Sequence, residues 1–270
     1  MLGDVVGEPG LMILEKRLPL LIKEYKADFT IVNGENAATG FGLTAETLDR
    51  ILASGADAVT SGNHVWEKRE FWPVLESSVQ PNGKPVLRPA NYPVMPPDKV
   101  PGRGWMILKK NGLSVLVLNL QGRELMTPID CPFQCFDAVA AEHSAAPPGS
   151  SIGVPIIVDF HAESAEEKEA LAYYLDGRAS IAAGTHTHVQ TADERILPKG
   201  TAYITDLGMT GATNGVIGMD RESCLNRARR QTSSRIECAK NVKEENCAVE
   251  GVIVELDKTG KALGITRISH

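Results

Sequence analysis

Short apolar runs without polar alternation are the clearest pattern along the chain. Runs of this kind are typical of strands that are buried on both faces of a sheet. They predict strands at residues 28–33, 57–60, 113–120, 155–160, 181–184 and 201–206. The sheet is therefore expected to be covered on both sides.

Segments with helical spacing of apolar residues alternate with these strands. They predict helices at residues 11–25, 44–54, 66–76, 136–143 and 165–175. Thr44 is a suitable N-cap for the second helix, and Gly55 follows that helix as a C-cap glycine. The alternation predicts a layered α/β fold with sheets flanked by helices and with its chemistry on loops at the strand ends.

The remaining segments favour one domain that spans residues 1–270. Residues 81–103 are rich in Pro and Gly and predict a long loop. Residues 249–256 and 262–268 predict a C-terminal hairpin around a turn that contains Gly260. Residues 227–246 are polar and charged, and we interpret them as a surface excursion rather than a second domain.

Composition narrows the classes of partner. The net charge is −6, and no basic run is longer than Arg229-Arg230. This argues against binding to a nucleic-acid backbone or an anionic membrane as the main activity. No stretch approaches the ~20 apolar residues that a membrane helix needs, and no signal peptide is expected. The five cysteines do not form a disulfide framework, so a cytoplasmic protein with reduced thiols is expected.

Polar residues that can bind metal follow five of the apolar runs. They lie in the segments GD, NGEN, SGNH, DFH and GTHTH, which hold four of the six histidines. Strand ends in an open α/β sheet converge on one crevice. Histidine nitrogens with carboxylate and amide oxygens suit Mn²⁺, Fe or Zn²⁺. The donors outnumber the needs of one ion, and the set predicts a two-metal site that clamps a phosphoryl group.

Two local arguments about side-chain direction support this site. His186 and His188 are expected to point to the same side, because residues two apart in an extended chain do so. Asn63 and His64 are expected to point apart, because neighbours in an extended chain face opposite ways.

The order of the motifs resembles the calcineurin-like metallophosphoesterase superfamily. That superfamily usually shows GD, a second GD, GNH, H and GHxH. Here Glu35 within NGEN replaces the second Asp, and the last motif is GTHTH. These departures, together with GDVVGEPG, GNHVWEK, DFHAE, THVQTAD and GMTG, resemble the YmdB-type bacterial metallophosphoesterases. The resemblance runs from Gly3 to about Glu222, and it implies the layered calcineurin-like fold.

The resemblance also implies a role for each motif. One ion would be held by Asp4, Glu35, Asn36 and His188. The other would be held by Glu35, Asn63, His161 and His186, with Glu35 as the bridge between the two ions. His64 would face the substrate and stabilise the transition state or protonate the leaving oxygen. A metal-bound hydroxide would be the nucleophile. The expected ions are two divalent cations per chain, Fe or Mn first, with Zn or Mg as alternatives.

Some of these residues have a structural alternative. Asn36 could order the Glu35 loop, and Asn63 could be a turn residue. Asp159 and Glu163 could orient histidines, or could serve only as surface or capping residues. For Asp206, which ends another apolar run, a structural role is favoured.

The start of the chain conflicts with the pattern. A buried strand should precede Asp4, yet only Met1, Leu2 and Gly3 do so. We expect either that the natural gene begins several codons earlier or that this first strand is clipped. A clipped strand would hold Asp4 less firmly.

The leading hypothesis is a metal-dependent phosphodiesterase. The resemblance directs it to cyclic nucleotides, notably 2′,3′-cyclic nucleotides and also 3′,5′-cyclic AMP, or to another small phosphodiester. A phosphomonoesterase or a nuclease on the same metal site is an alternative. An alternative of a different class is a non-catalytic regulator that binds a nucleotide or a protein such as an RNase. The sequence leaves open whether the chain forms a homo-oligomer.

Overall fold

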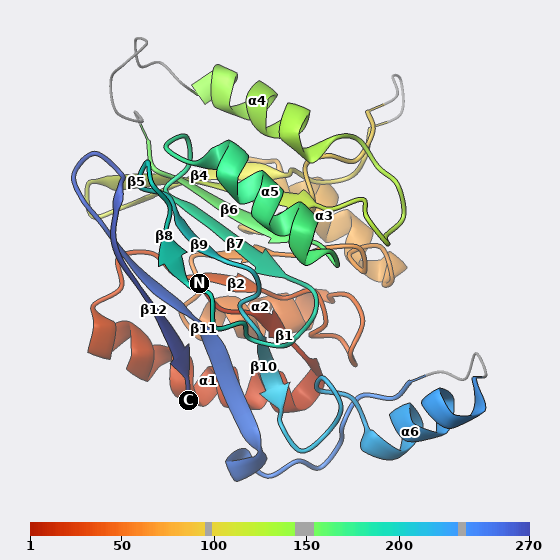
Figure 1. Cartoon of the computed structure of the whole chain (residues 1–270). Helices are drawn as coiled ribbons and strands as arrows, with labels where there is room; N and C mark the ends of the chain where they lie inside the picture. Colours follow the sequence, from red (N-terminus) through yellow and green to blue (C-terminus); the bar gives the residue numbers. More distant parts are fainter. Residues whose placement is uncertain (95–98, 144–153, 232–235) are drawn as a thin grey trace.

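The chain folds into sheets that are stacked between helices (Figure 1). The computed structural model describes residues 1–94, 99–143, 154–231 and 236–270, and the following elements lie in those residues. One sheet has the order β4-β5-β6-β7-β9-β8, a second has the order β1-β10-β11-β12, and a third pairs β2 with β3. Leu2 bridges to both Val32 and Gly251, which joins the two smaller sheets at the N-terminus.

The largest sheet is parallel in its centre. Its strands are β4 (Trp105–Lys110), β5 (Leu113–Gln121), β6 (Ile156–His161), β7 (Ile181–Thr185), β9 (Ala202–Ile204) and β8 (Arg195–Ile196). β5, β6, β7 and β9 are parallel, and the edge strands β4 and β8 pair antiparallel to their neighbours. Every residue of β6 and β7 is buried, as expected for strands covered on both faces.

The two faces of this sheet pack against different layers. Leu116 and Leu118 of β5 pack with Phe136 and Leu171, which come from α4 (Pro132–His143) and α5 (Ala165–Leu175). Val117 of β5 points the other way and packs with residues of the smaller sheets. Figure 1 shows α4 and α5 on one side of the large sheet and the smaller sheets on the other.

The smaller sheets carry helices on their own outer side. Their strands are β1 (Asp4–Val5), β2 (Ile31–Asn33), β3 (Ala58–Thr60), β10 (Met209–Ala212), β11 (Cys247–Leu256) and β12 (Ala262–Ser269). A second core cluster joins them to α1 (Gly7–Tyr25) and α2 (Ala45–Ala53). The predicted layered α/β fold with flanking helices and a C-terminal hairpin is confirmed.

Several predicted elements match closely. α5 has the predicted bounds. Thr44 caps α2, with its Oγ1 accepting a hydrogen bond from the Thr47 N–H at 3.2 Å. Gly55 follows with a φ of 111°, a conformation that favours glycine and ends the helix.

Three helix predictions were wrong at their starts. α4 begins at Pro132 rather than residue 136. α1 begins at Gly7 rather than residue 11 and includes Pro9. Proline is tolerated there because the first N–H groups of a helix have no partner within the helix. The helix predicted at residues 66–76 begins only with a 3₁₀ turn at Arg69–Phe71, and α3 follows at Trp72–Ser78. An earlier start would have placed Pro73 inside the helix, where its ring clashes with the preceding turn.

Other elements had no clear sequence signal. β4, β8 and β10 were not predicted; β4 is mostly half-buried and ends in two lysines, and β8 has only two residues. In residues 227–246, α6 (Arg221–Arg230) ends, and the 3₁₀ turn Glu244–Asn246 follows later. α6 has no buried residue and extends away from the sheets (Figure 1). Among the described residues, no helix is both long and apolar enough to span a membrane.

Candidate metal centre at the strand ends

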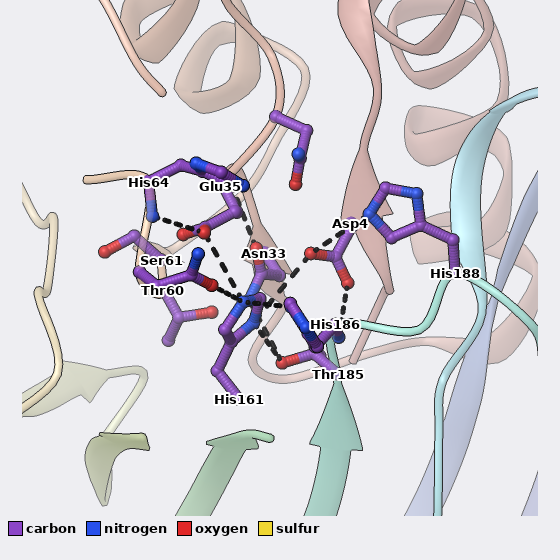
Figure 2. Close-up of polar contacts among 12 residues, drawn as sticks. Asp4, Asn33, Glu35, Thr60, Ser61, His64, His161, Thr185, His186 and His188 are labelled. Carbon is purple, nitrogen blue, oxygen red and sulfur yellow. Dashed lines mark hydrogen bonds and ion pairs between the residues drawn. The ribbon is translucent and has the colours of Figure 1, made fainter. Parts of the chain in front are cut away.

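Residues from five strand ends meet between the large sheet and the smaller sheets (Figure 2). β1 supplies Asp4, and the loop after β2 supplies Glu35 and Asn36. The loop after β3 supplies Asn63 and His64. His161 is the last residue of β6, while His186 and His188 follow β7. The seven predicted metal ligands fall into two groups that share Glu35.

Asp4 is held firmly although its strand is short. The first strand has only two residues, yet the residues before it are bonded on two sides. The Leu2 N–H donates to the Ile31 carbonyl at 2.9 Å, and the Gly3 N–H donates to the Glu250 carbonyl at 3.0 Å. Asp4 itself is fully buried. The expected loosening of Asp4 is therefore not seen.

Three predicted ligands of one ion lie around the Nε2 of a fourth, His161. The Oδ1 of Asn63 and the Nδ1 of His186 each lie 3.1 Å from it, and the Oε1 of Glu35 lies at 3.4 Å. We call Glu35, Asn63, His161 and His186 the His161 half. Donor atoms that each lie about 2.0–2.2 Å from a shared ion would be separated from one another by distances like those just given.

These side chains also shift each other's protonation. Burial opposes charge on His161, but Glu35 and Asp4 outweigh it and raise the pKa of His161 to about 9. Burial and the neighbouring His161 lower the pKa of His186 to about 3. Within the described residues, no three His, Cys, Asp or Glu side chains are already arranged as a cage for one ion. The donors of the His161 half contact one another instead.

The other group leaves buried oxygens without partners. We call Asp4, Glu35, Asn36 and His188 the Asp4 half. Three of its atoms have no hydrogen-bond partner among the described residues: the Oδ1 of Asp4, the Oε2 of Glu35 and the Oδ1 of Asn36. The Nε2 of His188 lies 3.8 Å from that Asp4 oxygen. Unpaired buried acceptors are costly, and carboxylate and amide oxygens together with an imidazole nitrogen are donors that suit a divalent cation such as Mn²⁺ or Fe²⁺.

Asn36 also orders the loop, as its structural alternative predicts. Its Nδ2 donates to the Gly40 carbonyl at 2.9 Å, which orders the loop after Glu35. Its Oδ1 stays free of protein partners. One side chain can therefore order the loop and offer an oxygen to a cation.

A second set of polar residues supports His161 from behind. The Oγ1 of Thr185 lies 3.0 Å from the Nδ1 of His161 and donates to Asp159 at 2.7 Å. Asn33 and Thr60 also donate to Asp159. Burial raises the pKa of Asp159 to about 6. Asp159 therefore orients His161 through Thr185, which is one of the two roles that were left open for it.

Glu163 makes the corresponding contact on the other histidine. Its Oε2 lies 3.0 Å from the Nε2 of His186, which leaves the Nδ1 of His186 facing His161. Sequence reasoning had assigned no role to Asn33, Thr60 or Thr185. Their shared signal is a polar residue at the last position of a buried strand.

The extended-chain argument for the two histidines was wrong. β7 ends at Thr185, and His186 and His188 have φ values of 104° and 64°. Positive φ is unfavourable for residues other than glycine and costs about 1–3 kcal/mol at each position. The two rings consequently reach different partners: His186 contacts His161, and His188 lies beside Asp4 (Figure 2).

The same correction applies to Asn63 and His64. β3 ends at Thr60, and both residues lie in a turn rather than an extended chain. Their side chains still diverge. Asn63 contacts His161, whereas the ring of His64 packs edge-on against Phe41 with centroids 5.0 Å apart. The His64 side chain is 25% exposed, so solvent or a ligand can reach it.

The residue before this pair, Gly62, has no room for a side chain. A Cβ at residue 62 would lie 2.1 Å from a carbon of the His161 ring. Any side chain there would displace the ring. The turn also aims the His64 backbone N–H at the Oε1 of Glu35, at 2.7 Å. The GNH motif thus positions Glu35 and His161 as well as its own side chains.

Solved structures define the class of fold to which this site belongs. A crystal structure described as a novel phosphatase from Mycoplasma pneumoniae matches with a TM-score of 0.85 and 32% identity, covering 100% of this chain and 91% of that chain. A hypothetical protein from Thermus thermophilus matches with a TM-score of 0.84 and 37% identity, covering 100% of this chain and 97% of that one. The layered fold is that of the metallophosphoesterases.

Within this class, the chain belongs to the YmdB-like protein family, whose model matches residues 1–268. It is 46% identical over 268 residues to a 2′,3′-cyclic-nucleotide 2′-phosphodiesterase of Bacillus subtilis (strain 168). The match covers 99% of this chain and 94% of that relative. The resemblance seen in the sequence motifs is confirmed.

Proposed function

We propose that this chain is a metal-dependent phosphodiesterase that hydrolyses 2′,3′-cyclic nucleotides at a site for two divalent ions, Fe or Mn. Membership of the YmdB-like family and the name of the Bacillus relative support the reaction and the substrate class. One structural observation supports the metal site above the others. Asp4, Glu35 and Asn36 each keep a buried oxygen without a hydrogen-bond partner.

Each half of the site would have its own ion. The Asp4 half would hold one ion and the His161 half the other, with Glu35 shared. Bound ions would neutralise charge on the phosphate and make water available as a nucleophile near neutral pH. Glu35 suits the shared position, because its Oε1 faces His161 and His64 while its Oε2 is unpaired.

His64 would act on the substrate rather than on an ion. Its backbone N–H is bonded to Glu35, and its partly exposed ring stays outside both groups of ligands. The Nδ1 of His64 lies 3.3 Å from Glu67, which leaves Nε2 for the phosphate. When water attacks the phosphorus of the cyclic ester, a new P–O bond forms and the P–O bond to one ribose oxygen breaks. His64 Nε2 would donate a proton to that departing oxygen.

The first test is hydrolysis by protein that has been stripped of metal and refilled with Mn²⁺. We expect turnover of 2′,3′-cyclic AMP and bis-p-nitrophenyl phosphate that is absent without metal and returns with it. 3′,5′-Cyclic AMP, assayed in parallel, tests whether the larger ring is also a substrate. Two bound ions without turnover of any diester would contradict the proposal and favour the non-catalytic regulator.

A phosphomonoesterase is the second candidate function. It is favoured by one finding, the description of the Mycoplasma structure as a phosphatase. The same protein should then be assayed with p-nitrophenyl phosphate and 3′-AMP. A higher kcat/KM for these monoesters than for 2′,3′-cyclic AMP would reverse our assignment.

A further inference from the structure

A buried ion pair lies directly behind the histidine loop. The Nζ of Lys168, on α5, is 2.7 Å from the Oδ2 of Asp206, which follows β9. The side chains are 1% and 0% exposed. A buried pair of opposite charges is weak evidence for stability alone, because apolar residues often do as well in its place. Its other contacts therefore indicate what it does.

Asp206 accepts hydrogen bonds from the backbone of the loop. Its Oδ2 accepts from the Thr187 N–H at 3.1 Å, and its Oδ1 accepts from the Gly208 N–H at 2.9 Å. Thr187 lies between His186 and His188, the two residues with positive φ. A strained backbone persists only where its surroundings hold it, and the Asp206 carboxylate is bonded at the centre of this strained segment.

We propose that Asp206, paired with Lys168, is a positioning residue that holds the 186–188 loop so that His186 and His188 reach the two halves of the metal centre. This inference rests on the proposed function. His186 belongs to the His161 half and His188 to the Asp4 half. A hydrogen bond to Thr187 therefore affects the binding of both ions, whereas each histidine contacts only one of them.

Every partner of the Asp206 carboxylate is a hydrogen-bond donor. An amide in its place would have to turn its NH₂ group toward Gly208 or toward Thr187 and Lys168, whichever way it is rotated. Asp206→Asn should thus release the loop while keeping the shape of the side chain. Lys168→Met removes only the countercharge and leaves the acceptor for Thr187, so it should have the smaller effect.

Asp176 provides a matched control. It is also a buried carboxylate, and it accepts hydrogen bonds from the Lys199 and Thr201 N–H groups. It ends α5, however, and no predicted metal ligand is among its hydrogen-bond partners. Asp176→Ala should lower the melting temperature without changing metal affinity.

The experiment is calorimetric titration of Mn²⁺ into stripped wild type, Asp206→Asn, Lys168→Met and Asp176→Ala, with circular dichroism to select folded samples. We expect Asp206→Asn to weaken both ions by about 10–100-fold, the range for residues that orient metal ligands. Lys168→Met should lower the affinity for both ions by a smaller factor, and Asp176→Ala should bind Mn²⁺ with the wild-type affinity. If Asp206→Asn does not fold, Lys168→Met decides.

Wild-type affinity for both ions in the decisive variant would overturn the inference. So would an equal loss in Asp176→Ala, because the effect would then be one of general stability. A wild-type protein that binds no Mn²⁺ would instead refute the proposed metal site itself. The wild-type arm therefore separates failure of the proposed function from failure of this inference.

Discussion

The His161 half of the site is crowded with side chains that already contact one another, whereas the Asp4 half leaves three buried oxygens unpaired. His161 has Asn63 and His186 at 3.1 Å and is supported from behind by Thr185. Asp4 accepts a bond from the His186 N–H through Oδ2, while its Oδ1 has no partner. The two halves of one centre thus differ in how many of their polar atoms find hydrogen-bond partners within the protein.

The difference follows from the chemistry of the donors. The His161 half mixes imidazoles with an amide and a carboxylate, and imidazoles can both donate and accept hydrogen bonds. The three unpaired oxygens of the Asp4 half can only accept hydrogen bonds, and no donor among the described residues reaches them. A cation is the partner that such a set fits, so the Asp4 half should depend on metal more than the His161 half does.

The largest expected effect comes from the residue that both halves share. Glu35→Gln should lower kcat/KM by at least about 10⁴-fold, because several kcal/mol of charge stabilisation would be lost. Metal analysis should find fewer than two ions per chain. Glu166→Gln, at an exposed position of α5, is the matched control and should resemble wild type. A Glu35→Gln variant with two ions would show that Glu35 is not the bridge.

The next effect tests the residue that belongs to neither half. His64→Ala should reduce kcat by about 10²–10⁴-fold, the usual contribution of a general acid, with the metal content unchanged. His270→Ala, at an exposed position, is the control for loss of a histidine. A loss of metal in His64→Ala would place His64 among the ligands and contradict its assignment to the substrate.

A smaller effect should be confined to the His161 half. Thr185→Val removes the hydroxyl between Asp159 and His161 and nearly preserves the side-chain shape. We expect one of the two Mn²⁺ affinities to fall by about 10–100-fold, while the other changes little. Calorimetric titration of the two sites measures this. Equal weakening of both ions would mean that the halves are not separable.

The smallest effect concerns the stability of the Asp4 half. Asp4→Asn replaces the unpaired oxygen with an NH₂ group and removes a buried charge beside Glu35. In stripped protein it should raise the free energy of unfolding by about 1–2 kcal/mol, because it removes a carboxylate charge that is fully buried and only partly hydrogen-bonded. With Mn²⁺ at 100 times its Kd, wild type should regain about 2.7 kcal/mol per ion. Urea unfolding with and without EDTA measures both.

The reversal of sign is the informative part of this last experiment. Asp4→Asn should be more stable than wild type without metal and less stable with it. If the variant were less stable in both conditions, the Asp4 oxygen would already be satisfied in the metal-free protein. The comparison between the two halves would then fail.

Much of the site could be predicted from the sequence because its residues follow strand ends. An apolar run ends in a polar residue for a limited number of reasons, and Glu35, Asn63 and His161 all follow such runs. The supporting residues carried a weaker signal. Thr185 and Asn33 also end strands, but a lone Thr or Asn there is common, and only its contact with Asp159 shows what it does.

The layered α/β fold, the family and the types of residue at each strand end could all be predicted from the sequence. Continuous apolar runs require a sheet covered on both faces, and that requirement is local to each run. The family resemblance already assigned each donor to one of two ions, and only the tertiary structure shows how the backbone brings the donors together, because that depends on turns rather than on strands. His186 and His188 separate because their backbone turns through positive φ, and the Thr187 N–H between them donates to Asp206, which follows β9. Periodicity cannot report a contact of that kind.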